Sequence, residues 1–575
     1  MNRNTQTHFS ETPTVGISRS KFDRSFTHKT TMDAGKIIPF FCCDILPGDT
    51  VKMNTAQVVR MQTPITPVMD NANLDTYFFF VPNRLVWEHW REFMGENDTS
   101  PWIQPITYSV PQVTAPAGGW TKGSLADYFG FPTEVSNYKA DALPFRAYAK
   151  CINDWFRDEN LQNPLYINYG DGDTAGVDIT SLTYDPITDT VAGAAPVAAC
   201  KTHDYFTSCL PGAQKSPAVK IPIGDSAPIV GSLDITTPTG INKATEMDGK
   251  PVGLIYKDDG SHNHSYFVDV DDPTTRQRMD TEIGLVADLS VAVGATINQL
   301  RQAFQIQKFF EKAALYGTRY IETIKAHFGV TNPDYRLQRA EYLGGMRTPI
   351  NINQVIQTDR TATNLQATYT DPDDPTTLKW VNQDVTPQGN AAAYSLTTGR
   401  NDDLFTHSFT EHGYLIGLAV IRLDAHTYQQ GLNRMFSRKS IFDYYWPEFA
   451  NLGNQAVLNK EIYLQGSSVV DSDGKVIDEQ AFGYQEAWAE YRYMPDIVTG
   501  EMRSNYAKSL DIWHWADDYA ALPTLGEDWI KEDKSNFART LAVQTQDQFM
   551  GDFYFKCIMT RPMPLYSVPG LIDHH

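Results

Sequence analysis

Acidic clusters are the residues of this 575-residue chain whose types and spacing come nearest to a metal site. Three short runs hold closely spaced aspartates: Asp171-Gly172-Asp173, Asp269-Val270-Asp271-Asp272 and Asp471-Ser472-Asp473-Gly474. A calcium loop begins in this way, but it also needs a third ligand and a terminal Glu at fixed spacing. None of the runs meets that requirement. Because Asp and Gly are favoured in turns, we interpret the runs as solvated turns and predict no metal site.

Short motifs that mark common active sites do not occur in the chain. It contains no G-x-S-x-G, H-E-x-x-H, P-loop or G-x-G-x-x-G sequence. Of its thirteen histidines only His262 and His264 are close-set, and their polar surroundings favour a loop. We therefore predict no catalytic residue, no cofactor and no enzymatic activity. One alternative stays open, an all-β carbohydrate-active enzyme or binding protein, because paired catalytic carboxylates are close in space rather than in sequence.

Net charge restricts what the chain can bind. Its 48 basic and 69 acidic residues give a net charge of −21, which repels nucleic acid over most of the surface. A nucleic-acid role must then be local or depend on a basic partner. The first thirty residues have a net charge of +3, with five basic residues: Arg3, Arg19, Lys21, Arg24 and Lys29. We interpret residues 1–30 as an extended arm, with an ordinary frayed terminus as the alternative.

Cysteine usage and apolar runs bear on the compartment. Six scattered cysteines without a C-x-x-C motif indicate reduced, buried thiols in a protein made in a cytoplasm. The first residues have no apolar stretch, so we predict no signal peptide. The longest apolar run, Tyr414–Ile421, is far shorter than the ~20 residues of a membrane-spanning helix, so we predict no membrane insertion.

Strand patterns dominate the chain, in which 12% of the residues are aromatic. Aromatic and β-branched residues fit pleated, half-buried surfaces. The patterns predict strands around residues 37–41, 51–55, 75–81, 413–423 and 553–559. In the last of these, Phe553, Phe555, Cys557 and Met559 fall on one face. We expect that strand to pair with the one near residue 80, so that the two ends of the chain share a sheet.

Helical spacing is confined to three segments. Apolar residues recur at helical intervals from Phe145 to Phe156, with Pro144 at the first helical position. A second helix is predicted from Ile297 to Tyr316, with a buried face made by Ile297, Leu300, Phe304, Phe310 and Ala314. A third is predicted from Arg84 to Met94. We interpret these stripes as core packing.

Two polar regions interrupt the strand patterns. Residues 168–282 contain 17 acidic and 8 basic residues and are rich in Gly, Pro, Asp and Thr. Residues 357–400 have a similar composition. Compact domains rarely contain loops of this length, so we interpret both as surface excursions with short strands of their own.

Several sequence blocks are specific enough to point to a family. They include Leu46-Pro47-Gly48-Asp49-Thr50, LDTYFFFVPNRL from Leu74, DYFTSCLP from Asp204, GTRYIE from Gly317 and FGYQE from Phe482. Together, and in order from about residue 22 to residue 573, these blocks resemble the major capsid protein of gokushoviruses, the small single-stranded DNA bacteriophages of the Microviridae.

The resemblance implies a mainly β fold, an eight-stranded antiparallel jelly roll with large loop insertions and a few short helices. It divides the chain into the arm, residues 1–30, and a single jelly-roll domain, residues 31–575. Residues 212–282 would form a protrusion at the three-fold axis, and residues 357–400 a second surface excursion. The implied function is that of a major capsid protein that self-assembles into a T=1 icosahedral shell around circular single-stranded DNA. We also expect the exposed insertion to contribute to host attachment.

Partners follow from the resemblance and from the charge. The chain would contact copies of itself, the packaged DNA, a minor capsid or pilot protein and a receptor on the host surface. Because a chain of net charge −21 must enclose a polyanion, we expect a small basic DNA-binding protein to supply much of the neutralisation. We also expect a locally basic inner face that includes Arg3, Arg19, Lys21, Arg24 and Lys29. The protein would be located in the virion, assembled in the host bacterial cytoplasm.

Overall fold

The computed structural model divides into two compact units, Met1–Lys215 with Glu311–His575, and Ser216–Phe310. It describes residues 17–97, 106–216, 229–230, 246–247, 250–258, 263–269, 276–278, 286–287, 297–316, 320–331, 333–336, 338–356, 368–371, 374–380 and 391–566.

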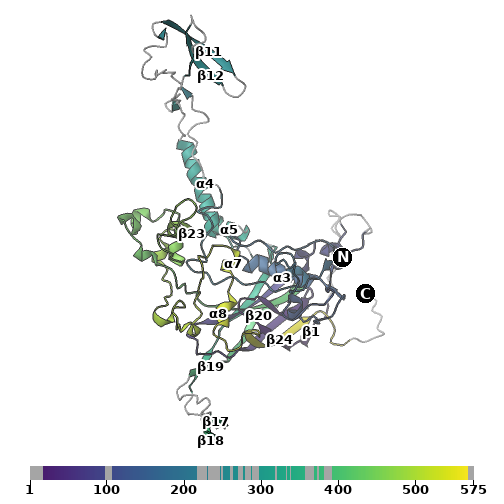
Figure 1. The fold of residues 1–575 in the computed structure, drawn as a ribbon. Helices are drawn as coiled ribbons and strands as arrows, with labels where there is room; N and C mark the ends of the chain where they lie inside the picture. The colour runs from purple at the N-terminus through teal and green to yellow at the C-terminus, as the bar shows by residue number, and fades with distance from the viewer. Residues whose placement is uncertain are drawn as a thin grey trace, which may run out of the picture. The chain divides into compact units, whose positions relative to one another are not determined.

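Two antiparallel sheets form the framework of the larger unit (Figure 1). The first sheet has the order β1-β24-β4-β20, with β2 also paired to β24. Its strands are β1 (Ser20–Asp23), β2 (Phe26–Met32), β4 (Thr50–Met61), β20 (Thr397–Ser408) and β24 (Phe549–Arg561). The second sheet has the order β15-β5-β21-β3. Its strands are β3 (Ile38–Ile45), β5 (Ala72–Pro82), β15 (Glu341–Pro349) and β21 (Gly413–Leu423).

The main hydrophobic core lies between these two sheets. Along β24 the side chains alternate, so that Phe553 and Phe555 are buried while Tyr554 is exposed. The buried rings meet rings of the second sheet: Phe40 lies 5.0 Å from Phe553 and Phe78 lies 6.4 Å from Phe555, measured between centroids. The chain is thus mainly β with antiparallel sheets, as predicted, and its two packed sheets are consistent with a viral capsid jelly roll.

The predicted pairing between residues 80 and 555 is wrong. Strand β5 lies between β15 and β21, whereas β24 pairs with β4, β1 and β2. The two segments belong to facing sheets and meet through their side chains across the core. Alternation tells which face a residue occupies but does not name the neighbouring strand. The expectation that segments from both ends share a sheet is confirmed by the pairing of β1 and β2 with β24.

A second core covers the other face of the second sheet, which explains why β5 is apolar on both faces. Helix α3 (Leu143–Cys151) continues as a π-helical turn, Ile152–Phe156, in agreement with the predicted helix. Its Phe145 and Tyr148 are fully buried with Phe79 of β5 and with Trp87 and Trp120.

The other two helix predictions hold only in part. Helix α4 has the predicted bounds, Ile297–Tyr316. On its predicted buried face Ala314 is buried, but Phe304 is 61% exposed. The segment 84–94 is not one helix. It contains a 3₁₀ turn, Asn83–Leu85, and the single turn α1 (Trp90–Phe93).

Short elements connect or extend these layers. In the larger unit they are β6 (Gln112–Thr114), β7 (Lys139–Asp141), β8 (Thr174–Ala175), β22 (Asn454–Leu458), β23 (Ala481–Glu486), α2 (Leu125–Tyr128), α5 (Tyr320–Phe328), α6 (Asn459–Ile462), α7 (Glu527–Ile530) and α8 (Lys534–Ala538). The excursion at 357–400 contains the hairpin of β17 (Thr368–Asp371) and β18 (Asp374–Trp380), and β19 (Ala391–Ser395) pairs with β16 (Ile352–Ile356).

The smaller unit, Ser216–Phe310, contains most of the predicted insertion 212–282. Its described strands form one four-stranded antiparallel sheet and one two-stranded sheet. The first contains β10 (Glu246–Met247), β11 (Lys250–Asp258), β12 (Asn263–Asp269) and β13 (Arg276–Arg278), and the second β9 (Ile229–Val230) and β14 (Val286–Ala287).

Candidate nucleic-acid interface

On the face of the first sheet that points away from the core, basic side chains project from neighbouring strands. Along strand β4 the side chains alternate, so that Val51, Met53 and Val59 are buried while Lys52 and Arg60 are exposed. We call the exposed residues Lys21, Lys29, Lys52, Arg60, Tyr554 and Lys556 the basic sheet face.

Strand register brings these residues together. Arg60 lies opposite Met550, Lys52 opposite Ile558, and Lys556 opposite Asn54. On the other side of β24, Lys29 lies opposite Asp552 and Lys21 opposite Thr560. Neighbouring strands are about 4.8 Å apart, so the cations span a continuous strip three strands wide.

The strip has the opposite charge to the molecule as a whole. The outward positions of these strands hold five cations and two acids, Asp23 and Asp552. Lys29 forms an exposed ion pair with Asp552 at 3.3 Å. Within the described residues, Lys52 and Arg60 have no ion-pair partner within 4.0 Å. These two cations are therefore available to an external anion.

Exposed apolar surface accompanies the cations. Tyr554 is 44% exposed, and Met550 and Val58 are exposed on the same face of the sheet. A shallow hollow of about 770 Å³ is lined by Lys29, Arg60 and Met550, among others. Cations on both sides of an exposed ring suit a single-stranded nucleic acid, whose phosphates pair with the cations and whose unpaired bases stack on the ring.

The residues predicted from the sequence fall into three groups. Lys21 and Lys29 lie on the basic sheet face, and Arg19 lies exposed near Gly48. Arg24 is turned to the sheet edge, where its Nη1 donates to Cys43 Sγ at 3.1 Å and lies 3.5 Å from Asp44. Arg3 lies outside the described residues. Of the predicted arm, residues 1–30, the structure describes residues 17–30, of which residues 20–23 and 26–30 lie in β1 and β2.

Sequence reasoning missed Lys52, Arg60, Tyr554 and Lys556. The signal was available, because alternation in residues 50–61 and 549–561 already puts these four residues on the solvent faces of their strands. What alternation could not supply was the pairing of these strands with each other and with β1 and β2.

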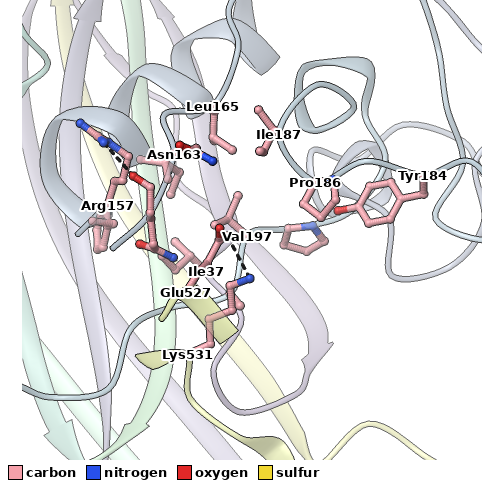
Figure 2. A pocket seen from close by; sticks show the side chains of 15 residues that line it. Ile37, Arg157, Asn163, Leu165, Tyr184, Pro186, Ile187, Val197, Glu527 and Lys531 are labelled. Carbon is pink, nitrogen blue, oxygen red and sulfur yellow. Dashed lines mark hydrogen bonds and ion pairs between the residues drawn. The ribbon is translucent and has the colours of Figure 1, made fainter. Parts of the chain in front are cut away.

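One alternative site is the pocket shown in Figure 2. It has a volume of about 160 Å³ and a mostly apolar lining that includes Ile37, Leu165 and Val197. Its charged groups are already engaged: Lys531 lies 3.0 Å from Glu527, and Arg157 donates to the Gln162 carbonyl at 3.0 Å. Glu527 is the one carboxylate in the lining, so the pocket does not supply the two carboxylates of a glycoside hydrolase.

The acidic runs that the structure describes are occupied by internal contacts. Asp471 accepts hydrogen bonds from the backbone N–H groups of Asp473 and Lys475, the pattern of a turn. Asp171 accepts from Trp87 Nε1 at 2.7 Å, and Asp173 pairs with Lys139 at 2.8 Å. Within the described part of the chain, no group of three or more His, Cys, Asp or Glu side chains is arranged to hold a metal ion.

The cysteines are all unpaired thiols, as predicted. Burial raises the pKa of Cys200 and of Cys557 to about 11, so both are protonated at neutral pH. Among the helices that the structure describes, none combines the length and the apolar character needed to cross a membrane.

Comparisons with known proteins agree with one another. A family model described as capsid protein (F protein) matches residues 10–370 and 376–571. Capsid protein VP1 of Chlamydia phage 1 is 42% identical over 604 aligned residues, which cover 98% of this chain and 97% of that protein. Capsid protein VP1 of Bdellovibrio phage phiMH2K is 40% identical, with 99% and 98% covered. Capsid protein VP1 of Spiroplasma virus 4 is also 40% identical, with 96% of each chain covered.

Proposed function

The chain belongs to the phage capsid protein (F protein) family, and from this premise we propose that it builds a T=1 icosahedral shell around circular single-stranded DNA. Membership of the family makes it a structural protein of the virion, which forms a homo-oligomeric shell and is not an enzyme. The T=1 geometry, the single-stranded genome and assembly in the bacterial cytoplasm belong to the proposal.

The observation that carries the DNA part of the proposal is the basic sheet face. Although the chain has a net charge of −21, this strip is locally positive, with five cations, two acids and an exposed Tyr554. A locally positive surface is what DNA binding requires. We therefore propose that this face lines the shell interior, together with Arg3 and Arg19. Arg24 is less suited to the role because it is engaged at the sheet edge.

A second polypeptide is also needed under this proposal. Even with the basic sheet face turned inward, each copy adds a large negative charge close to the packaged DNA. A small basic DNA-binding protein would neutralise it, and a minor capsid or pilot protein would complete the particle. The proposal for the basic protein is wrong if purified particles hold full-length DNA without a basic polypeptide, a polyamine or an excess of metal ions.

Charge reversal tests the interior role. The double variant Lys52→Glu, Arg60→Glu should assemble into shells that contain at least several-fold less DNA, because two phosphate-binding groups become repulsive. Lys475→Glu is the matched control, since Lys475 is exposed in a turn away from this face. DNA content per particle, measured by the ratio of absorbance at 260 and 280 nm, decides the outcome. Equal DNA content in all three particles would contradict the interior role.

Microscopy tests the shell itself. Negative-stain images of the recombinant protein should show uniform closed particles. Dispersed single molecules with glycosidase activity would instead support the carbohydrate-active alternative.

We further propose that residues 212–282 form the three-fold protrusion and contribute to host attachment. The acidic, Gly- and Pro-rich composition of this insertion is unsuited to holding DNA and suited to an exposed position. Replacing residues 214–280 with a short Gly/Ser linker should leave shells with DNA inside that no longer adsorb to host cells. If such particles adsorb normally, the attachment role is wrong and residues 357–400 become the next candidate. If no shells form, the insertion is mainly structural.

A further inference from the structure

Large apolar side chains gather on the surface of the larger unit between residues 436 and 497. Phe436 is 70% exposed, Phe442 67% and Ile497 65%. Ile441, Tyr445 and Trp446 are exposed as well. We call these six residues the aromatic face. Exposed apolar side chains of this number and size usually mark an interaction site in a soluble protein.

Local contacts fix these side chains in place. The backbone N–H groups of Lys439 and Ser440 both donate to Asp443 Oδ2 at 2.7 Å, which closes the turn that presents Phe442. Trp446 Nε1 donates to the Ile441 carbonyl at 2.9 Å, and the backbone N–H of Tyr445 donates to Tyr491 Oη at 3.2 Å. Because the face is already ordered, a partner that covers it loses little conformational entropy.

Charged groups near the face are neutralised from within. Arg434 lies 3.1 Å from the buried carboxylate of Glu461 and 3.8 Å from Glu490. The guanidinium of Arg438 lies over the ring of Tyr491, 4.4 Å from its centroid, and 3.9 Å from Glu490. Both arginines are therefore engaged, and neither is placed to bind phosphate. This distinguishes the aromatic face from the basic sheet face and argues against nucleic acid as its ligand.

A groove of about 270 Å³ adjoins the projecting rings. Phe436, Leu432, Tyr493 and Ile497 contribute to its lining. Its lining also includes charged side chains, among them Arg434, Glu461 and Asp496. Projecting rings beside such a groove form the kind of surface in which interface hot spots are found, since aromatic residues and Arg are enriched there.

The amount of exposed surface fits a protein partner. Thirteen large apolar side chains are exposed within residues 435–452 and 491–510. Seven of them are aromatic. An aromatic side chain buries about 150–250 Å² when fully covered, so at about half exposure these seven offer roughly 700 Å², to which the six aliphatic side chains add. That is about one partner's share of a standard stable interface.

We propose that the aromatic face docks onto a second copy of this chain and is one of the contacts that close the shell. The inference rests on the proposed shell, because a closed particle of identical chains requires several distinct contacts per copy. Aromatic and aliphatic surface of this size, with Arg434 and Arg438 paired internally, has the composition of an interface between permanent partners.

Charge substitutions on the full-length chain test the docking. Phe442→Glu and Phe436→Glu should each lower the yield of sedimenting shells at least tenfold, while the protein stays soluble as dispersed subunits with an unchanged circular dichroism spectrum. Leu182→Glu is the matched control, because Leu182 is fully exposed outside the aromatic face, and its yield should stay within twofold of the parent. If Phe442→Glu and Phe436→Glu assemble as well as Leu182→Glu, the proposal is overturned.

A cross-linking experiment identifies the partner and covers the case in which the glutamate variants do not fold. The photoreactive analogue p-benzoylphenylalanine replaces Phe442, which keeps a ring at this position. Irradiation should give a product of twice the chain mass. A product with a different polypeptide, or a product within one chain alone, would overturn the docking onto a second copy. If the parent chain forms this dimer but no shells, the proposed shell fails while the contact stands.

Discussion

The basic sheet face and the aromatic face belong to the same unit, but different kinds of interaction fix the positions of their side chains. Backbone hydrogen bonds of β1, β2, β4 and β24 set the positions on the basic sheet face, so each side chain only has to point outward. The aromatic face lies between Asp424 and Gln548, where β22 and β23 are the only strands. Its turns are held by side-chain hydrogen bonds and ion pairs. We therefore expect substitution of an outward side chain to change binding on either face, and substitution of the groups that link the turns to change structure around the second.

A buried ionic cluster is the clearest of these side-chain links. Lys201 Nζ lies 2.9 Å from Asp517 Oδ2, and His426 lies 3.4 Å from the same oxygen. His426 Nε2 also lies 3.2 Å from Glu532. All four side chains are almost completely buried. The cluster joins three parts of the chain that are far apart in the sequence, around residue 201, around residue 426 and at residues 517–532.

The largest effect is expected from breaking this cluster. Asp517→Asn would leave Lys201 and His426 with too little negative charge in a buried site, so the free energy of unfolding should fall by about 3–5 kcal/mol. Asp473→Asn, in an exposed turn, should change it by less than about 0.5 kcal/mol. Denaturant unfolding of dispersed subunits measures both. Equal stability of the two variants would show that the cluster does not hold this region.

Alkaline pH should weaken the same region without any substitution. Burial opposes protonation of His426, but its contacts with Asp517 and Glu532 outweigh burial and raise its pKa to about 9. A pKa raised above the unfolded value of about 6.5 gives stability that is complete below pH 6.5 and lost as the pH rises through 9, in total about 3 kcal/mol. Unfolding midpoints between pH 6 and pH 10 should fall accordingly, and the variant His426→Gln should lose this dependence. A parent protein with a flat profile would contradict the role of His426.

Neutralising the cations of the basic sheet face should change binding more than stability. Each phosphate contact contributes about 0.7 to the slope of log K against log salt for single-stranded nucleic acid. The double variant Lys52→Ala, Arg60→Ala should therefore bind a single-stranded oligonucleotide with a slope that is shallower by about 1.4. Fluorescence anisotropy with dispersed subunits at several salt concentrations gives the slope. An unchanged slope would place the phosphates elsewhere.

The smallest effect on stability is expected at Asp552, where a substitution should also strengthen DNA binding instead of weakening it. Its ion pair with Lys29 is exposed, so Asp552→Asn should alter the free energy of unfolding by less than about 1 kcal/mol. It also removes an acid from the basic sheet face, so oligonucleotide binding should tighten. The same anisotropy measurement applies, with Asp473→Asn as the control. Weaker binding by Asp552→Asn would contradict the proposed DNA-binding strip.

Local patterns predicted those parts of the molecule in which one face of an element is buried. The alternation of Phe553, Phe555 and Cys557 and the helical stripe from Phe145 to Phe156 both match the structure. Prediction failed where exposure depends on distant neighbours. Phe304 lies on an apolar stripe of α4 and is nevertheless exposed, and the segment 84–94 breaks into two turns.

By itself, the sequence determined the β class, the free cysteines, the net charge and the family. Composition, alternation and short sequence blocks can all be recognised without knowing how the chain folds. Only the tertiary structure decided that Lys21 and Lys29 lie on the same face as Lys52, Arg60 and Lys556. It also decided that the side chain of Arg24 lies at the sheet edge instead of on this face. It also decided that the rings near residue 440 remain outside the core. The physical reason is common to both: strand partners and burial are set by which surfaces fit together across the whole chain, and no single segment contains that information.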